Sequence, residues 1–195
     1  MEGTTESRAN GSSCQKKAYI DGELSLIKKI FNEEREKNEK GGSRAAGSLI
    51  SRSFWMSDKM NDESLTNQDR YLMLYLMTNT YQNMIGCFLP NMRKTEFETH
   101  LNRQQIHDSL DRLKAVGAIE VSSQSDEVMI YDWLVYSIGS GGATNVQRML
   151  RDANSVRDRG LLKKIYQYYT ERFERLSATT RTFIRILGER IAEER

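Results

Sequence analysis

The chain has 195 residues, of which 38% are hydrophobic and 29% are charged, and its formal net charge is +2. This length allows one domain of typical size with appendages, and the polar composition favours a modest core with exposed helices over a large enzyme. No apolar run approaches the roughly 18 residues that a membrane span needs, and the polar N-terminus carries no apolar signal segment, so we expect a cytoplasmic protein with no membrane contact.

The first part of the chain is expected to have little fixed structure. Residues 1–22 are rich in Ser, Gly, Thr and Asn, a composition typical of disorder. The 23–40 segment offers only a short apolar helical face before a run of charge, so a helix there is marginal unless it docks. The GGSRAAGS stretch at 41–48 is typical of a flexible linker. The expected domains are therefore 1–48 (arm and linker), 49–138 (ordered domain) and 139–195 (helical extension).

The ordered domain is expected to open with a central helix. Thr66 is a suitable N-cap, and Asp69 follows it at the spacing of a capping box. The run YLMLYLM at 71–77 is apolar almost all round, which favours a helix in the middle of its domain. After a polar loop, CFLP at 87–90 predicts a short strand, which Pro90 ends because proline cannot donate to a sheet ladder.

Two further helices carry clear start signals. Asn91 can cap a helix over 92–99, and Asn102 with Gln105 forms a reciprocal cap for the helix that follows. In that third helix apolar residues recur at the core-facing spacing i, i+4, i+7; they are Ile106, Leu110 and Leu113. The two helices are therefore expected to pack against the central one across a tight turn.

A hairpin should complete this part of the fold. Gly117 is a suitable stop for the third helix, and strands are expected over 118–123 and 127–135, on either side of a QSD turn. The order helix, short strand, helix, turn, helix, hairpin is that of a winged helix-turn-helix. We therefore predict a mainly α fold with a small antiparallel β-sheet.

The extension after the hairpin is expected to be helical. The glycine-rich stretch SIGSGGAT at 137–144 precedes two proline-free helical segments, over about 144–170 and 171–194. Their apolar faces consist of Leu161, Leu162, Ile165, Tyr168 and Tyr169 in the first and Phe173, Leu176, Phe183, Ile184 and Leu187 in the second. Neither segment can bury a core alone, so we expect them to pack on the winged helix, on each other or on a second copy of the chain.

The third helix of a helix-turn-helix enters the major groove and presents its first residues to the bases. Arg103, Gln104 and His107 occupy that face, and Arg and Gln can each make paired hydrogen bonds to purine edges. Arg93 and Lys94 lie at the start of the second helix, where phosphate contacts commonly fall.

Acidic residues oppose this interpretation. The same helical face carries Asp108 and Asp111, and the hairpin turn SSQSDE carries two acids and no Lys or Arg. The winged helix can equally be a protein-interaction or oligomerisation module, since the fold does not decide the function.

The C-terminal segment is a second candidate for phosphate contact. Residues 144–195 contain 12 Lys/Arg against 7 Asp/Glu, so the basic character of the chain lies there. The cations that cluster in its first helical segment are Arg148, Arg151, Arg157, Arg159, Lys163 and Lys164. A solvated helix face accounts for the same pattern.

Metal binding and catalysis find little support. His100 and His107 are the only histidines, and no Cys, Asp or Glu set completes a four-ligand site of usual spacing. His100 fits better as a left-handed turn residue, a conformation in which His is enriched. Cys14 and Cys87 lie far apart and predict free thiols. We expect no metal, no cofactor and no enzymatic activity.

Several segments resemble a known family. The chain contains an R-x-F-W opening, a Leu/Tyr-rich helix, a T-N-x-x-x-N-x-x-G-x-F/Y pattern and a W-L-x-Y ending. These motifs consist of Arg52, Phe54, Trp55, Thr78, Asn79, Asn83, Gly86, Phe88, Trp133, Leu134 and Tyr136. Together they resemble, over 50–138, the N-terminal domain of phage and prophage replication proteins of the DnaD-like, replisome-organiser type. The Y-x-x-x-I-x-x-W motif of that family's usual C-terminal domain is absent.

The resemblance implies a role in starting phage or mobile-element DNA replication in the nucleoid of a bacterial host, through binding of origin DNA, self-association and recruitment of the replicative helicase or its loader. The expected DNA partner is duplex, and single-stranded DNA stays open as a second one. It also implies that the winged helix serves assembly while C-terminal helices contact DNA. Two alternatives stay open at this point. One is a transcriptional regulator whose third helix contacts bases through Arg103, Gln104 and His107, and the other is an assembly adaptor that binds no nucleic acid.

Overall fold

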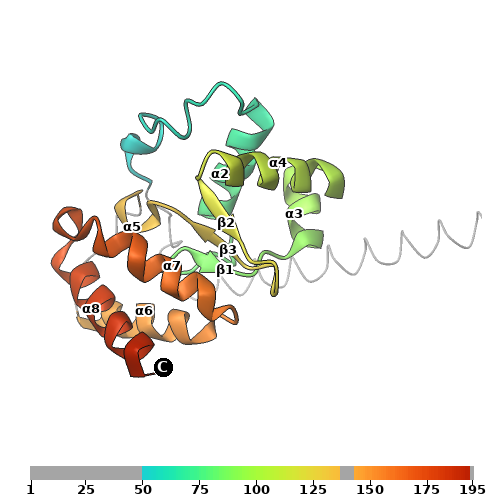
Figure 1. The fold of residues 1–195 in the computed structure, drawn as a ribbon. Coiled ribbons are helices and arrows are strands. Elements are labelled where there is room, and N and C mark those ends of the chain that lie inside the picture. Colours follow the sequence, from blue (N-terminus) through green and yellow to red (C-terminus); the bar gives the residue numbers. More distant parts are fainter. Residues whose placement is uncertain (1–49, 137–142, 194–195) are drawn as a thin grey trace, which may run out of the picture. The chain divides into compact units, whose positions relative to one another are not determined.

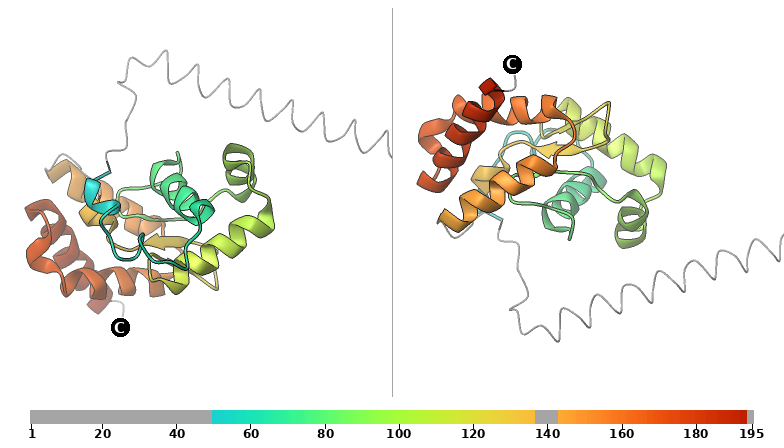
Figure 2. Two further views of the ribbon diagram at one scale, coloured as in Figure 1. Left: turned by 90° about the horizontal axis from the view of Figure 1, so that it is seen from above. Right: turned by 90° about the horizontal axis from the view of Figure 1, so that it is seen from below.

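A computed structural model of the chain describes residues 50–136 and 143–193 (Figures 1 and 2). They belong to one compact unit. The expectations for the 1–48 arm and for the glycine-rich stretch after Tyr136 fall outside or largely outside these residues. The described part contains seven α-helices and one three-stranded antiparallel sheet, so the predicted mainly α class is confirmed. None of its helices combines the length and apolarity needed to cross a membrane.

The central helix α2 (Asn67–Thr78) starts where its capping residues predict. The Thr66 side chain accepts from the Asp69 backbone N–H, and the Asp69 side chain accepts from the Thr66 N–H in return. Four side chains of the apolar run are buried, namely Leu72, Met73, Leu76 and Met77.

Helices α3 (Met92–Thr99) and α4 (Arg103–Ala115) also match their predicted caps. Asn91 caps α3, and Asn102 forms a capping box with Gln105 at the start of α4. His100 adopts the left-handed conformation at φ 58° in the turn between them, as predicted.

The sheet has the strand order β1-β3-β2, formed by β1 (Cys87–Phe88), β2 (Ile119–Val121) and β3 (Val128–Ile130). Because side chains alternate along a strand, the register divides them between two faces. One face carries Phe88, Val121 and Val128, and the other carries Cys87, Glu120 and Met129. The sheet therefore separates two hydrophobic clusters.

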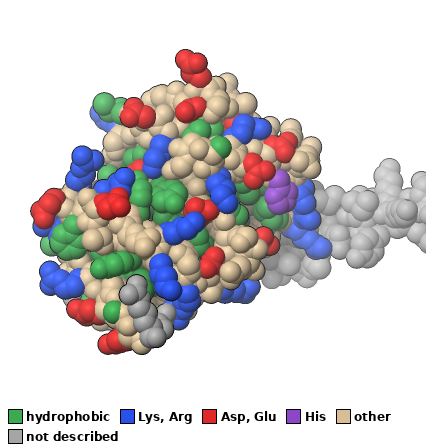
Figure 3. All heavy atoms as spheres, viewed as in Figure 1, with side chains coloured by type: hydrophobic (Ala, Val, Ile, Leu, Met, Phe, Trp, Pro, Cys, Tyr) green, Lys and Arg blue, Asp and Glu red, His purple; other side chains and the backbone are tan. Residues whose placement is uncertain are grey.

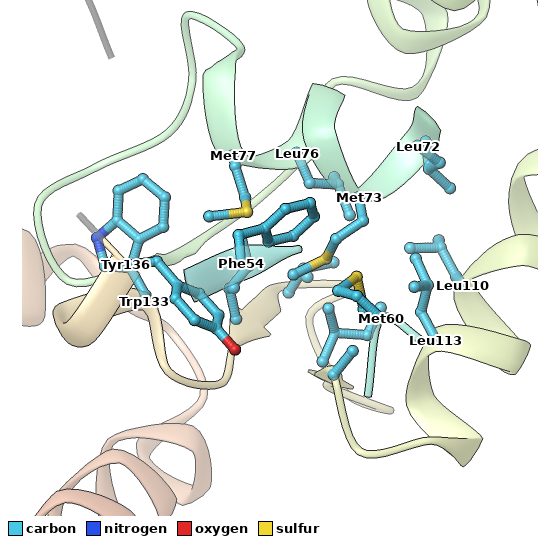
Figure 4. Close-up of a cluster of buried hydrophobic side chains, with 14 of the residues drawn as sticks. Phe54, Met60, Leu72, Met73, Leu76, Met77, Leu110, Leu113, Trp133 and Tyr136 are labelled. Carbon is cyan, nitrogen blue, oxygen red and sulfur yellow. The ribbon is translucent and has the colours of Figure 1, made fainter. Parts of the chain in front are cut away.

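The first cluster joins α2 and α4 to one face of the sheet. Figure 4 shows Phe54, from the short helix η1 (Arg52–Phe54), between α2 and the aromatic residues that follow the sheet. The Phe54 ring meets the Tyr136 ring edge-on at 5.9 Å, and the Ser51 N–H donates to the Tyr136 carbonyl at 2.9 Å. The beginning and the end of this region thus close on each other.

The second cluster covers the other face with α6 (Ala143–Ser155), α7 (Arg159–Thr170) and α8 (Ala178–Glu193). Ile85, Cys87 and Met129 contribute to it from the sheet side. The predicted C-terminal apolar faces are therefore buried within the chain, against each other and against the sheet. Figures 1 and 2 show these three helices across the sheet from α2, α3 and α4.

Three predicted elements are wrong in extent. The strand expected over 127–135 ends at Ile130, because Asp132 takes a left-handed backbone at φ 59° and the chain enters the short helix α5 (Trp133–Tyr136). This turn lets the Trp133 indole N–H donate to the Met84 carbonyl at 3.1 Å.

The helix expected over 144–170 is interrupted between Ser155 and Arg159, where Asp158 caps the start of α7 through the Gly160 N–H. The last helix begins at Ala178 rather than at 171, after the short helix η2 (Phe173–Arg175). The Ser177 hydroxyl accepts there from the Thr180 N–H.

Candidate nucleic-acid interface

The predicted base-contacting residues of α4 are engaged within the chain. Arg103 Nε lies 3.1 Å from Glu96 Oε1 of α3, and Gln104 donates to Asp108 Oδ1 at 2.8 Å. His107 is exposed. Groups that already have partners must give them up before they can bind a base. The start of α4 is therefore a weak site for direct base contact.

The two candidates of α3 behave differently from each other. Arg93 is exposed, whereas the Lys94 ammonium donates to Thr80 Oγ1 at 2.9 Å and lies 4.9 Å from the centre of the Tyr81 ring. Lys94 thus extends over the loop after α2 rather than toward the start of α4. The structure brings this predicted phosphate contact next to an aromatic ring that is 40% exposed.

The C-terminal cations surround the turn between α6 and α7. Arg148 and Arg151 belong to α6, Arg157 lies in the turn, and Arg159, Lys163 and Lys164 belong to α7; all six are exposed. Within the described residues, no ion pair involves Arg148, Arg151, Arg157 or Lys163. Figure 3 shows Lys and Arg side chains on the face that α7 presents to the viewer, with acidic groups among them.

Lys164 of this set forms an ion pair with the sheet. It lies 2.8 Å from Glu120 of β2, which also contacts Lys114 of α4 at 3.2 Å. Burial alone would raise the pKa of Glu120, but the hydrogen bonds from the two lysines outweigh it and lower that pKa. Glu120 therefore holds two cations beside α7 while cancelling part of their charge.

A buried carboxylate from the hairpin fixes the turn that carries Arg157. Glu127 is 3% exposed, and its side chain accepts from the Arg157 N–H at 2.9 Å, from the Asp158 N–H at 2.9 Å and from the Ser125 hydroxyl at 2.7 Å. On the other side of α7, Arg190 donates to Asn154 at 3.0 Å. We refer to Arg151, Arg157, Arg159, Lys163 and Arg190 as the basic turn.

The motif residues that carry the family resemblance have structural roles. Asn79 Oδ1 accepts from the N–H groups of Tyr81 and Gln82 at the end of α2. Asn83 Oδ1 accepts from the Cys87 N–H, and its amide donates to the Cys87 carbonyl. These bonds shape the loop over 79–88 and cover the outer edge of β1.

Gly86 of the same motif has φ +67°, and a Cβ there would lie 2.3 Å from Trp133 Cγ. This glycine is needed both for its left-handed backbone and for the close approach of the indole.

The strongest shift of a carboxyl pKa also belongs to a structural pair. Asp69 is fully buried and accepts from Arg112 Nε at 2.8 Å and Nη2 at 2.9 Å. Burial alone would raise the pKa of Asp69, but hydrogen bonds from Arg112, Ser109 and Thr66 outweigh it and hold that pKa far below its usual range. This pair ties α2 to α4; its carboxylate is buried, whereas the Arg112 side chain is 36% exposed.

No group of three or more His, Cys, Asp or Glu side chains within residues 50–136 and 143–193 is arranged to hold a metal ion. His100 and His107 are both exposed.

Sequence reasoning missed three residues of this surface, namely Tyr81, Glu127 and Arg190. Tyr81 lies in a polar loop. An aromatic residue there that fits neither a helical nor a strand pattern of apolar residues could have been recognised as exposed. Arg190 is 31 positions beyond Arg159 in the chain, and nothing local connects the two. Comparisons of this chain with protein-family models, with curated proteins and with solved structures found no match.

Proposed function

We propose that residues 50–136 form a winged helix whose hairpin faces inward. The element order and the sheet order β1-β3-β2 support this assignment. The hairpin turn offers acids and hydroxyls to its own chain, and Glu127 is bound to the α6–α7 turn. A wing in this arrangement positions other elements and leaves phosphate contact to them.

With this winged helix as its scaffold, the protein binds the phosphate backbone of DNA through the basic turn. The observation that carries the proposal is the contrast between the two candidate sets of DNA-contacting side chains. Arg103 and Gln104 of α4 are paired within the chain, whereas Arg151, Arg157 and Lys163 have no ion pair in the described part. Exposed, unpaired cations are the groups that exchange counterions for phosphates.

This contrast favours sequence-independent binding over the recognition of an operator. Such binding suits a replication-initiation or replisome-organising protein, the role that the resemblance implies. In that role the protein self-associates on DNA and recruits the replicative helicase or its loader. Like other proteins that bind the DNA backbone, it needs no catalytic group of its own.

The test is duplex binding by full-length protein carrying Arg151→Gln, Arg157→Gln and Lys163→Gln. Fluorescence polarisation with two unrelated 30-base-pair duplexes at 100 mM salt is the measurement. Removal of three phosphate contacts is expected to weaken binding by roughly 100-fold on both sequences.

The matched control neutralises three cations elsewhere that are exposed and also lack an ion pair in the described residues, Arg52, Arg175 and Arg185. It changes the net charge equally and should alter affinity by less than threefold. Equal losses in the two variants would show that overall charge, rather than the basic turn, governs binding.

A further inference from the structure

A pocket opens beside the basic turn. It has a volume of about 260 Å³ and lies between the β1 edge and the end of α6. Tyr81 and Leu89 line it from the loop and strand side, and Asp152, Ser155 and Arg157 line it from α6 and the turn. Arg157 connects this pocket to the basic turn, whereas Tyr81 and Leu89 have no part in the roles described above.

The pocket combines an exposed aromatic ring, an aliphatic side chain and a cation. Tyr81 is 40% and Leu89 is 41% exposed, so both present apolar surface to solvent. Arg157 is exposed, and its side chain has no ion pair among the described residues. Lys94 lies 4.9 Å from the centre of the Tyr81 ring, so positive charge flanks this aromatic residue on the α3 side as well.

The acidic side chains of the pocket are held by the fold. Both Glu127 oxygens accept from the Arg157 N–H, at 2.9 and 3.1 Å, and Asp152 Oδ2 accepts from the Met84 N–H at 2.9 Å. The second oxygen of Asp152 has no hydrogen-bond partner within residues 50–136 and 143–193. It leaves one acceptor in the pocket, which matches the amino group of a base.

We propose that this pocket binds one unpaired nucleotide of a single-stranded nucleic acid, with its base on the Tyr81 ring and its phosphate at Arg157. Stacking on an aromatic side chain beside a positively charged track is the general way in which proteins hold single strands. The track runs from the other cations of the basic turn through Arg157 to Tyr81. A base in a duplex cannot reach the ring, because it stays stacked and paired. This inference rests on the proposed DNA binding, and it makes Tyr81 the residue that binds single-stranded but not duplex nucleic acid.

The test compares Tyr81→Ala, Tyr81→Phe and Tyr71→Ala in the full-length chain. Tyr71 is a second exposed tyrosine, on α2 and outside the pocket. Fluorescence polarisation is measured with a mixed-sequence 20-nucleotide single strand and with the matching duplex. Loss of one stacked base is expected to weaken single-strand binding by roughly 5- to 150-fold in Tyr81→Ala. Duplex binding of that variant should change by less than threefold, and Tyr81→Phe and Tyr71→Ala should bind the single strand like the wild type.

Each outcome separates this inference from the proposed function. If Tyr81→Ala binds the single strand as tightly as the wild type, while the basic-turn variant has lost duplex binding, the nucleotide pocket is refuted and the DNA-binding role stands. If Tyr81→Ala weakens duplex and single-strand binding equally, Tyr81 only supports the fold and the pocket is also refuted. If the wild type binds neither form at low salt, both proposals fail. A photo-cross-link from a 5-iodouracil-bearing single strand to Tyr81 gives independent support, and its loss in Tyr81→Ala is the control.

Discussion

Replacement of Glu127 by alanine tests how the hairpin supports the basic turn. The wild-type side chain accepts hydrogen bonds from the Arg157 and Asp158 N–H groups and from the Ser125 hydroxyl. A hydrogen bond to a charged group contributes about 1.5–3 kcal/mol, and water can replace part of this contribution because the turn borders the surface. We therefore expect Glu127→Ala to lower the free energy of unfolding by about 2–4 kcal/mol.

The assay is urea unfolding followed by circular dichroism, combined with amide hydrogen exchange. A loss of this size shifts the unfolding midpoint by about 1–2 M urea, and the amides of Arg157 and Asp158 should lose protection first. Glu127→Gln keeps an acceptor oxygen and should recover part of the loss, whereas Gln124→Ala, at an exposed position of the same hairpin, should have no effect. Unchanged stability together with unchanged exchange at the turn would refute the reasoning.

Three further predictions concern the interior. Gly86→Ala should cost about 2–6 kcal/mol, because it strains a left-handed backbone and displaces the Trp133 indole; a melting temperature within two degrees of the wild type would contradict this. Asp69→Asn should cost about 1–3 kcal/mol at pH 7, because it weakens the charge-assisted hydrogen bonds to Arg112, whose 36% exposed side chain stays partly hydrated. The pKa of Asp69 is depressed in the folded state, so the wild type is more stable than the variant above the unfolded-state pKa of about 3.9. This stability difference shrinks as the pH falls further. A stability difference that grows below about pH 4 in urea titrations would contradict the prediction. Burial raises the pKa of the Cys87 thiol, so iodoacetamide should label it, by peptide mass mapping, only after urea unfolding; rapid labelling in buffer would show that the site is open.

Local signals predicted the starts of α2, α3 and α4 because a cap depends on residues only three positions apart. The pairs Thr66–Asp69 and Asn102–Gln105 illustrate this, and the left-handed His100 follows the same logic. The break between α6 and α7 could not be predicted in this way. It depends on Glu127, which lies thirty positions before Arg157 and contacts it only once the hairpin has folded.

The candidate site shows the same limit. The sequence identified most cations of the basic turn, because exposure of Lys and Arg is the usual outcome. It did not show that Arg103 would pair with Glu96 across the α3–α4 turn. The sequence therefore made the start of α4 a stronger candidate for base contact than its geometry supports. Tyr81 went unnoticed because its importance comes from Arg157 and Asp152, which approach it only through the packing of α6 against the sheet.

The packing also affects how the C-terminal helices can be tested. A truncation at residue 140 would remove them but would also expose Ile85, Cys87 and Met129, which form one wall of the second cluster. Substitutions on the surface keep that cluster intact, so they separate charge from folding.

The salt dependence of duplex binding tests the central claim most directly. The equilibrium constant of the wild type and of the Arg151, Arg157 and Lys163 variant would be measured between 50 and 300 mM salt. Each phosphate contact contributes a slope of about −0.9 in a plot of log K against log salt concentration, so the variant slope should be shallower by about 2.7. Parallel lines for the two proteins would contradict the assignment of DNA contact to the basic turn.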